Sequence, residues 1–176
     1  MTGRRGVVMV YTGDGKGKTT AALGLALRAS GHGEKVFLAQ FRKNDPTYGE
    51  IKAIRKFLPN ITVVQSREGR FVLDGNFTPE DYRDAENVFR QGREAVMSGE
   101  YGLVIFDEIN FAIANGLVKV TDLLALLGER PPHVNVVLTG RNADPAVVAA
   151  ADLVSEVREV KHHFQSGINA QPGVEY

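Results

Sequence analysis

Residues 11–20, YTGDGKGKTT, hold three glycines, two lysines and three threonines within ten positions. They follow the apolar run GVVMV and precede a segment rich in alanine and leucine, which is the order strand, loop, helix. Such a loop aims several backbone N–H groups and the positive end of the helix at one point. Glycine permits positive φ and leaves no side chain between those amides and a bound anion. The segment therefore predicts a cradle for a polyphosphate.

Two side chains complete the predicted cradle. Lys18, which we expect to face solvent, adds a positive charge, and the hydroxyl of Thr19 can ligate magnesium. The usual phosphate-loop pattern is G-x-x-x-x-G-K-[ST], and here Thr12 takes its first position. Lys16 either meets phosphate as well or stays a solvated loop lysine. The residues predicted to bind the nucleotide are Gly13, Asp14, Gly15, Lys16, Gly17, Lys18, Thr19 and Thr20.

The second half of such a site is an acidic strand end, which YGLVIFDEINF supplies. An apolar run leads to Asp107 and Glu108, where a carboxylate can hold magnesium directly or through water. Successive strand residues point to opposite faces, so we expect only one of the two to reach the metal. The alternative is an ordinary exposed strand end, a position that acidic residues often occupy.

Short apolar runs rich in β-branched residues alternate with helix-like segments along the chain. Most runs show no polar alternation, so we expect both of their faces to be covered. The predicted strands are 7–11, 36–39, 61–64, 103–106, 134–138 and 153–157. Helices are predicted from Thr19 and, each with an N-cap and a first-turn proline, after Thr78 and Asp144. This alternation predicts a single domain over residues 1–176: a doubly wound, mostly parallel α/β sheet flanked by helices. The phosphate loop after the first strand adds the expectation of a P-loop (RecA-like) nucleotide-binding fold.

Ligands of such sheets bind at the carboxyl ends of the strands. The glycine loop and the acidic pair both lie at predicted strand ends, and so do the polar clusters 40–43 and 139–141. We therefore expect four clusters to meet at one edge of the sheet and to form one site.

Composition limits the possible partners. The 176 residues carry a formal net charge of zero, so no global field favours nucleic acid or an anionic membrane. The chain has no cysteine, which excludes disulfides, thiolate zinc sites and thiol nucleophiles. No signal peptide or apolar run of spanning length is present in the sequence. These features predict a cytoplasmic protein with no membrane or nucleic-acid partner.

The residues alone predict ATP binding and leave the reaction open. Phosphoryl transfer, mechanical ATPase work and adenosyl transfer can all use this cradle, although the chain length favours a small transferase over a motor. One hypothesis is a phosphate-loop kinase or ATPase that acts on a small molecule. Another is a non-catalytic ATP-binding or regulatory module.

Three segments together carry a family likeness. VYTGDGKGKTTAALGLALRASGHG, LVIFDEINFAI and VVLTGRNADPAVVAAADLVSEVREVKHHFQSGINAQPGVEY resemble the ATP:corrinoid adenosyltransferases of the CobA/CobO/BtuR type. The likeness covers nearly the whole chain in order. Its most discriminating part is the tail, of the form V-K-H-x-F-x-x-G-I-x-A-Q-x-G-x-x-Y, because generic phosphate-loop ATPases have no such ending.

The resemblance implies a reaction and its participants. A corrinoid reduced to Co(I) attacks the 5′ carbon of ATP, forms a cobalt–carbon bond and releases triphosphate. The resemblance thus implies that ATP is a co-substrate and that Mg²⁺ (or Mn²⁺) is bound with it. It further implies that a flavoprotein donates the electron and that the protein forms a homodimer. The nucleotide is expected to lie reversed in the loop, so that its 5′ carbon faces the nucleophile.

The same resemblance assigns roles to residues. Glu108 is the expected magnesium carboxylate, supported by Asp107, and Thr19 supplies the other ligand. Lys18 and Arg141 are expected to stabilise the triphosphate, for which the planar fork of arginine is suited. A surface arginine at the start of the next helix is the alternative for Arg141.

The sequence also departs from the family pattern. Phe71-Val72-Leu73 stands where some relatives have Phe-x-Trp, so Phe71 is the candidate to contact the lower face of the corrinoid; a core or hairpin phenylalanine is the alternative. His162-His163 replaces the usual His-Pro in the tail. Neighbours in an extended segment point apart, so we expect no metal site at this pair.

Overall fold

The computed structural model describes residues 5–42, 45–66 and 76–176. The strands are β1 Val8–Thr12, β2 Val36–Gln40, β3 Ile61–Gln65, β4 Leu103–Asp107, β5 Asn135–Thr139 and β6 Leu153–Glu156. The helices are α1 Lys18–Gly31, α2 Gly49–Phe57, α3 Pro79–Ser98, α4 Ile109–Ala114, α5 Val120–Glu129 and α6 Pro145–Ala150, and a 3₁₀ helix covers His163–Ser166.

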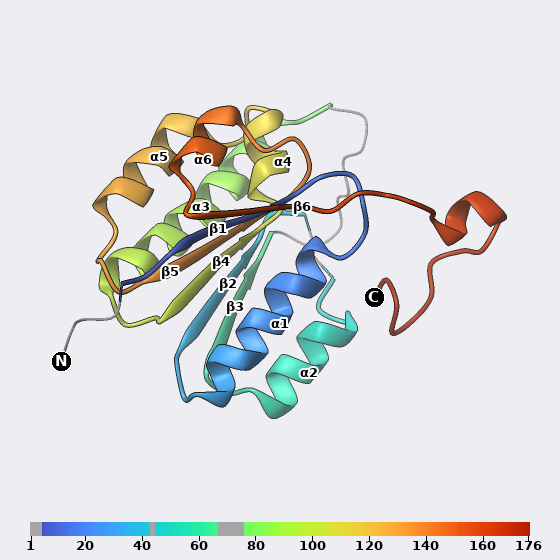
Figure 1. Cartoon of the computed structure of the whole chain (residues 1–176), viewed down its shortest axis with the longest axis horizontal. Helices are drawn as coiled ribbons and strands as arrows, with labels where there is room; N and C mark the ends of the chain where they lie inside the picture. The colour runs from blue at the N-terminus through green and yellow to red at the C-terminus, as the bar shows by residue number, and fades with distance from the viewer. Residues whose placement is uncertain (1–4, 43–44, 67–75) are drawn as a thin grey trace.

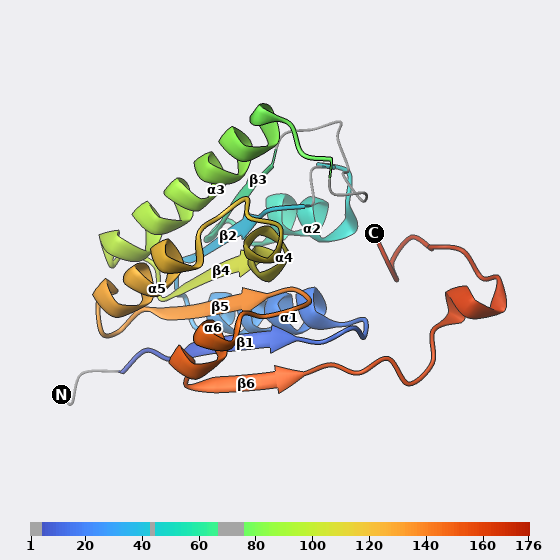
Figure 2. The ribbon, with the colours of Figure 1, turned by 90° about the horizontal axis from the view of Figure 1, so that it is seen from above.

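The described strands form one parallel sheet in the order β3-β2-β4-β5-β1-β6 (Figure 2). Helices α1 and α2 cover one face, and α3 to α6 lie on the other (Figure 1). Strand β5 separates β1, which leads into the glycine loop, from β4, which ends in the acidic pair. The prediction of a doubly wound parallel α/β sheet is confirmed.

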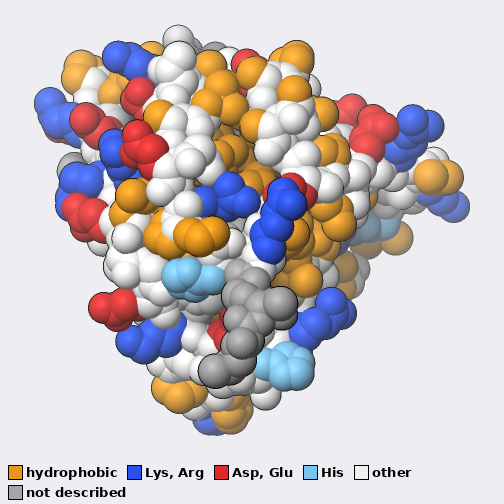
Figure 3. All heavy atoms as spheres, turned by 60° about the vertical axis from the view of Figure 1, so that its left-hand side comes forward, with side chains coloured by type: hydrophobic (Ala, Val, Ile, Leu, Met, Phe, Trp, Pro, Cys, Tyr) orange, Lys and Arg blue, Asp and Glu red, His pale blue; other side chains and the backbone are white. Residues whose placement is uncertain are grey.

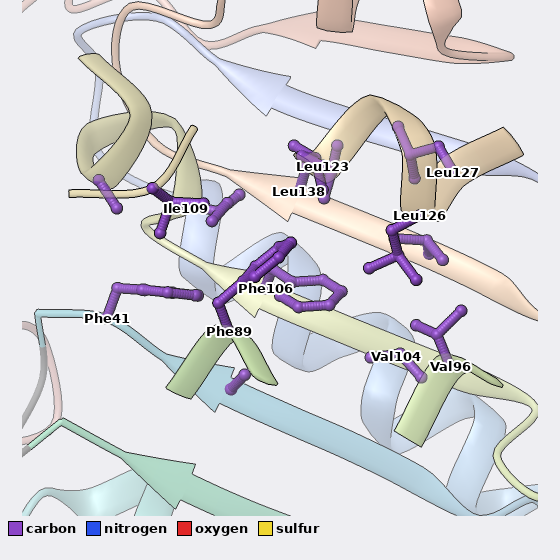
Figure 4. Packing of buried hydrophobic residues seen from close by; sticks show 14 of the residues in the cluster. Phe41, Phe89, Val96, Val104, Phe106, Ile109, Leu123, Leu126, Leu127 and Leu138 are labelled. Carbon is purple, nitrogen blue, oxygen red and sulfur yellow. The ribbon is translucent and has the colours of Figure 1, made fainter. Parts of the chain in front are cut away.

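Hydrophobic residues are buried on both faces of the sheet, which explains why the inner strands lack polar alternation. In β4, Val104 and Phe106 pack beneath α3 and α5, whereas Leu103 and Ile105 belong to the core on the α1 side (Figure 4). The ring of Phe106 lies 6.0 Å from that of Phe89, between centroids. Alternating residues of one strand thus bury apolar surface in two separate layers, as parallel sheets require.

The predicted elements agree with the structure except in two respects. All six strands lie within one residue of their predicted bounds, and the capping predictions hold: Thr78 and Asp81 form a capping box, and Asp144 accepts a hydrogen bond from the Ala146 amide at 2.8 Å. The shorter helices α2, α4 and α5 were not predicted. Strand β6 is not covered on both faces: Leu153 and Val154 remain 44% and 42% exposed, because β6 is an edge strand with β1 as its neighbour.

The surface carries charges of both signs. On the side shown in Figure 3, basic and acidic side chains are interspersed with apolar ones, and neither sign gathers into one broad patch. Among the described residues, no helix combines the length and the apolar character that crossing a membrane requires.

Candidate functional site

A cavity of about 630 Å³ opens at the carboxyl edge of the sheet, where the sequence predicted a site. The glycine loop and the first turn of α1 form one wall, and the beginning of α2 and the C-terminal tail form others. The residues lining it are Asp14, Gly15, Lys16, Gly17, Lys18, Thr19, Thr20, Leu23, Gly49, Glu50, Ala53, Glu108, Arg141, Glu159, His162, Gly173, Val174, Glu175 and Tyr176. Three of the four predicted clusters therefore contribute side chains to one cavity.

The loop glycines serve two different purposes. Gly13 and Gly17 have φ of 95° and 121°, a region that side chains disfavour. Gly15 does not have positive φ; a Cβ there would instead collide with the backbone of Arg158. The amide of Gly15 donates to the Val157 carbonyl at 2.8 Å. Close packing of the chain after β6, as well as backbone conformation, thus requires glycine in this loop.

Lys18 is buried, and the prediction that it faces solvent is wrong. Its side chain folds back along the loop, and its ammonium donates to the carbonyls of Gly13 and Gly15, both at 2.7 Å. Burial lowers the pKa of this ammonium, and the nearby carboxylate of Glu108 opposes that shift. Lys18 therefore both holds the loop in shape and places positive charge at the wall of the cavity.

Asp107 is completely buried and joins three elements. Its Oδ1 accepts hydrogen bonds from the hydroxyls of Thr19 at 2.8 Å and Thr139 at 2.7 Å. Its Oδ2 accepts from the Nε2 of Gln40 at 3.1 Å. Because the Thr19 hydroxyl donates its only hydrogen to Asp107, the lone pairs of its oxygen stay available to accept a hydrogen bond or to bind a cation. Asp107 therefore orients the hydroxyl that the loop offers to a cation.

Glu108, the next residue, points to the cavity instead of the core. It adopts a left-handed conformation with φ of 66°, and its amide donates to the hydroxyl of Thr139 at 2.9 Å. This turn ends β4 and starts α4, and it places the Glu108 side chain in the cavity wall beside Lys18 and Thr19. Glu108 lines the cavity and Asp107 does not; that only one of the two reaches the metal stays a prediction.

These oxygens suit a magnesium ion bound together with a nucleotide. The described residues contain no group of three or more His, Cys, Asp or Glu side chains that could enclose a metal by themselves. Mg²⁺ in phosphate-transferring sites is typically bound by one or two protein oxygens, with water and substrate phosphates completing its shell. Thr19 and Glu108 provide a donor set of that kind at the cavity.

Arg141 lies beside the loop. Its Nη2 donates to the Asp14 carbonyl at 3.1 Å, while its side chain keeps 60% of its surface exposed. Asp144, and not Arg141, caps the helix that follows. Arg141 therefore lies at the cavity wall, and its contact with phosphate stays a prediction.

The cluster after β2 lies near the same edge but contributes differently. The guanidinium of Arg42 lies over the ring of Phe111, 4.1 Å from its centroid. Burial lowers the pKa of this guanidinium. Gln40 is fully buried beneath the edge. Lys43 falls outside the described residues.

The C-terminal tail reaches the loop, which the sequence analysis did not predict. Glu175 lies 3.4 Å from the ammonium of Lys16 and 3.3 Å from Nε2 of His163. The ring of Tyr176 lies 6.3 Å from that of Tyr48, next to the start of α2. Figure 1 shows how the chain after β6 runs outward and turns back toward α1 and α2. Lys16 is therefore an exposed lysine that pairs with a carboxylate of the same chain, and its contact with phosphate stays a prediction.

Replacing Glu175 with glutamine should strengthen tripolyphosphate binding by about two- to five-fold, the range expected for a partly exposed ion pair. The substitution keeps the size of the side chain and frees the charge of Lys16. Isothermal titration calorimetry with tripolyphosphate measures the effect. Glu159→Gln is the matched control, because Glu159 lines the same cavity but pairs with Gln165. Weaker binding by Glu175→Gln would mean that the contact helps to form the site.

The two adjacent histidines do not point apart, contrary to the prediction. Their rings stack with centroids 4.5 Å apart. His162 caps the 3₁₀ helix through Nδ1, which accepts from the Phe164 amide at 3.2 Å, and His163 begins that helix. We expected an extended segment here. The backbone turns instead, and this brings the two rings together. Phe71, the candidate corrinoid contact, lies outside the described residues.

Comparison with known proteins identifies the family of this chain. A family model described as ATP:corrinoid adenosyltransferase BtuR/CobO/CobP matches residues 4–176. The chain belongs to the ATP:corrinoid adenosyltransferase family. A corrinoid adenosyltransferase of Pseudomonas aeruginosa is 38% identical over 172 residues, which cover 98% of this chain and 84% of the relative. Its counterpart in Escherichia coli K12 is 35% identical, and the corrinoid adenosyltransferase CobA of Salmonella typhimurium is 34% identical; each match covers 98% of this chain and 86% of the relative.

Membership of the corrinoid adenosyltransferase family confirms the resemblance that the three sequence segments indicated. It also gives a chemical context to the cavity that the phosphate loop, Glu108 and Arg141 line together. The assignment of individual residues to metal, phosphate or corrinoid stays a prediction.

Proposed function

We propose that this protein transfers the 5′-deoxyadenosyl group of ATP to the Co(I) centre of a reduced corrinoid. The electron pair of Co(I) forms the new bond to the 5′ carbon. The bond between that carbon and the triphosphate oxygen breaks, and its electrons leave with tripolyphosphate. Family membership and the polyphosphate-binding character of the cavity support the proposal. The single observation that carries it is the meeting of Lys18, Glu108 and Arg141 at one cavity wall, at the end of a phosphate loop.

The role of the protein in this reaction is to position the triphosphate and to stabilise its charge. Co(I) is itself the nucleophile, so the side chains need not generate one. The loop amides and Lys18 are placed to hold the phosphates, and Arg141 can add a bidentate contact. Holding the reactants in the right geometry lowers the barrier further. Magnesium, or manganese, bound by Thr19 and Glu108 would neutralise part of the phosphate charge.

The finer parts of the proposal concern substrate and partners. We expect the acceptor to be cobalamin or cobyrinic acid a,c-diamide, which makes the enzyme a cob(I)alamin-type adenosyltransferase. A reduced flavoprotein would supply the electron that converts Co(II) to Co(I). We further propose a cytoplasmic homodimer.

One anaerobic assay tests the proposed function against the two alternatives. The protein is incubated with ATP, magnesium and a chemically reduced corrinoid, while corrinoid spectra and phosphate products are followed together. Alkylated corrinoid with tripolyphosphate is the expected result. Orthophosphate or ADP without alkylation would indicate a kinase or ATPase instead, and ATP binding without turnover would indicate a regulatory module.

A further inference from the structure

A row of polar side chains crosses the buried edge of the sheet from β3 toward the metal-binding hydroxyl. The strand register places Gln40 of β2 opposite both Gln65 of β3 and Asp107 of β4. The side chains are bonded in series: Gln65 Nε2 donates to Gln40 Oε1 at 3.1 Å, and Gln40 Nε2 donates to Asp107 Oδ2 at 3.1 Å. Gln40 and Asp107 are both fully buried.

The direction of this row is determined by its ends. Asp107, as a carboxylate, can only accept, so the amide nitrogen of Gln40 must face it. The oxygen of Gln40 then faces away, where the amide of Gln65 donates to it. A reversed Gln40 amide would set oxygen against carboxylate on one side and nitrogen against nitrogen on the other. Gln65 therefore keeps Gln40 in the orientation that Asp107 needs.

The row reaches the functional site through the two oxygens of Asp107. Gln40 holds Oδ2, and this leaves Oδ1 directed at the hydroxyls of Thr19 and Thr139. Without the donor on Oδ2, the buried carboxylate would lose one of its three partners and could rotate. The Thr19 hydroxyl would then lose the bond that keeps its lone pairs turned outward. Outer partners of this kind commonly orient the groups that contact a metal.

We propose that Gln40 is a positioning residue for the magnesium site, which acts through Asp107 on the hydroxyl of Thr19, and that Gln65 fixes its orientation. The proposal rests on the proposed function, because it requires magnesium–ATP in this cavity. Gln40 itself neither lines the cavity nor is placed to contact the nucleotide. Its effect should therefore appear in the magnesium requirement and not in the affinity for metal-free nucleotide.

The test measures ATP binding by calorimetry at a series of magnesium concentrations, and again in a chelator. Gln40→Met keeps a similar volume but removes both hydrogen bonds. It should raise the magnesium concentration for half-maximal ATP binding about tenfold, and leave ATP binding in the chelator unchanged. Gln65→Met should shift the magnesium midpoint in the same direction by a smaller factor. This second variant, at a less buried position, also carries the test if Gln40→Met fails to fold.

Asn135→Met is the matched structural control. Asn135 is a buried amide with two backbone partners at the opposite end of the strands: it donates to the Gly102 carbonyl at 2.8 Å and accepts from the Val7 amide at 3.1 Å. This variant should lower the melting temperature without moving the magnesium midpoint. A Gln40→Met protein that behaves in the same way would overturn the proposal, because its role would be merely structural.

The two proposals fail in different ways. If the wild-type protein alkylates a corrinoid but Gln40→Met and Gln65→Met keep its magnesium midpoint, the positioning role is wrong and the proposed function stands. If the wild-type protein shows magnesium-dependent ATP binding without alkylation, the proposed function fails while the shift in midpoint still supports the role of Gln40. An absence of magnesium dependence in the wild type would overturn the positioning role.

Discussion

Lys18→Ala should reduce the rate of corrinoid alkylation by about two to three orders of magnitude, the loss typical when one preorganised electrostatic contact is removed. The substitution takes away the positive charge that the loop directs toward the triphosphate. It also removes two 2.7 Å hydrogen bonds to the carbonyls of Gly13 and Gly15. We therefore expect both a rate defect and a lower melting temperature, whereas a solvent-facing lysine would have given the rate defect alone. Steady-state kinetics with saturating corrinoid, alongside thermal unfolding, measures the two effects.

Lys16→Ala is the control for Lys18→Ala. It removes the same charge from the same loop, but the side chain of Lys16 is 40% exposed and already paired with Glu175. Its loss should change the alkylation rate less than about tenfold, because exposed ion pairs contribute little. Near-wild-type alkylation by Lys18→Ala would contradict the assignment of this loop as the triphosphate cradle.

Glu108→Gln should raise the magnesium concentration needed for half-maximal alkylation by about tenfold or more and should leave corrinoid affinity almost unchanged. Glutamine keeps the size of the side chain but loses the charge that attracts the cation. The left-handed turn at this residue, with φ of 66°, exists with either side chain, so the path of the backbone should persist. Magnesium titrations of the alkylation rate, with corrinoid binding followed by its spectrum, measure the change.

Asp107→Asn distinguishes the role of Asp107 from that of Glu108. An amide in this buried position would present N–H groups to donors that now bond to oxygen, at a cost of about 1–3 kcal/mol for an unsatisfied group. Its main effect should therefore be lower stability, measured by denaturant unfolding. If Glu108→Gln has the wild-type magnesium titration and Asp107→Asn, although folded, does not, then Asp107 is the direct metal ligand.

The core of the site could be predicted because it depends on local chain geometry. A strand, a glycine-rich loop and a helix follow one another within residues 8–31, so the cradle forms from neighbours in the sequence. Strand ends in a parallel sheet meet at one edge, which is why Asp107, Glu108 and Arg141 could be assigned to the same place from their positions after apolar runs.

Three features of the site and the fold could not be predicted from local sequence. Lys18 was expected to face solvent, but in the structure the loop closes around its ammonium. The N-cap residues of α2, α4 and α5 make no side-chain capping hydrogen bond, so these helices lack the start signals that marked α3 and α6 in the sequence. The exposed faces of β6 follow from its place at the sheet edge, which hydrophobicity alone does not reveal.

The sequence by itself determined the order of elements, the phosphate loop and the family, because these follow from spacing along the chain. Only the tertiary structure decided which side chains from distant parts of the chain contact one another. It set Glu175 against Lys16, turned Asp107 inward and Glu108 toward the cavity, and aligned Gln65, Gln40 and Asp107 in one register. The physical reason is that strand order and the path of the returning tail are fixed by packing between residues distant in sequence.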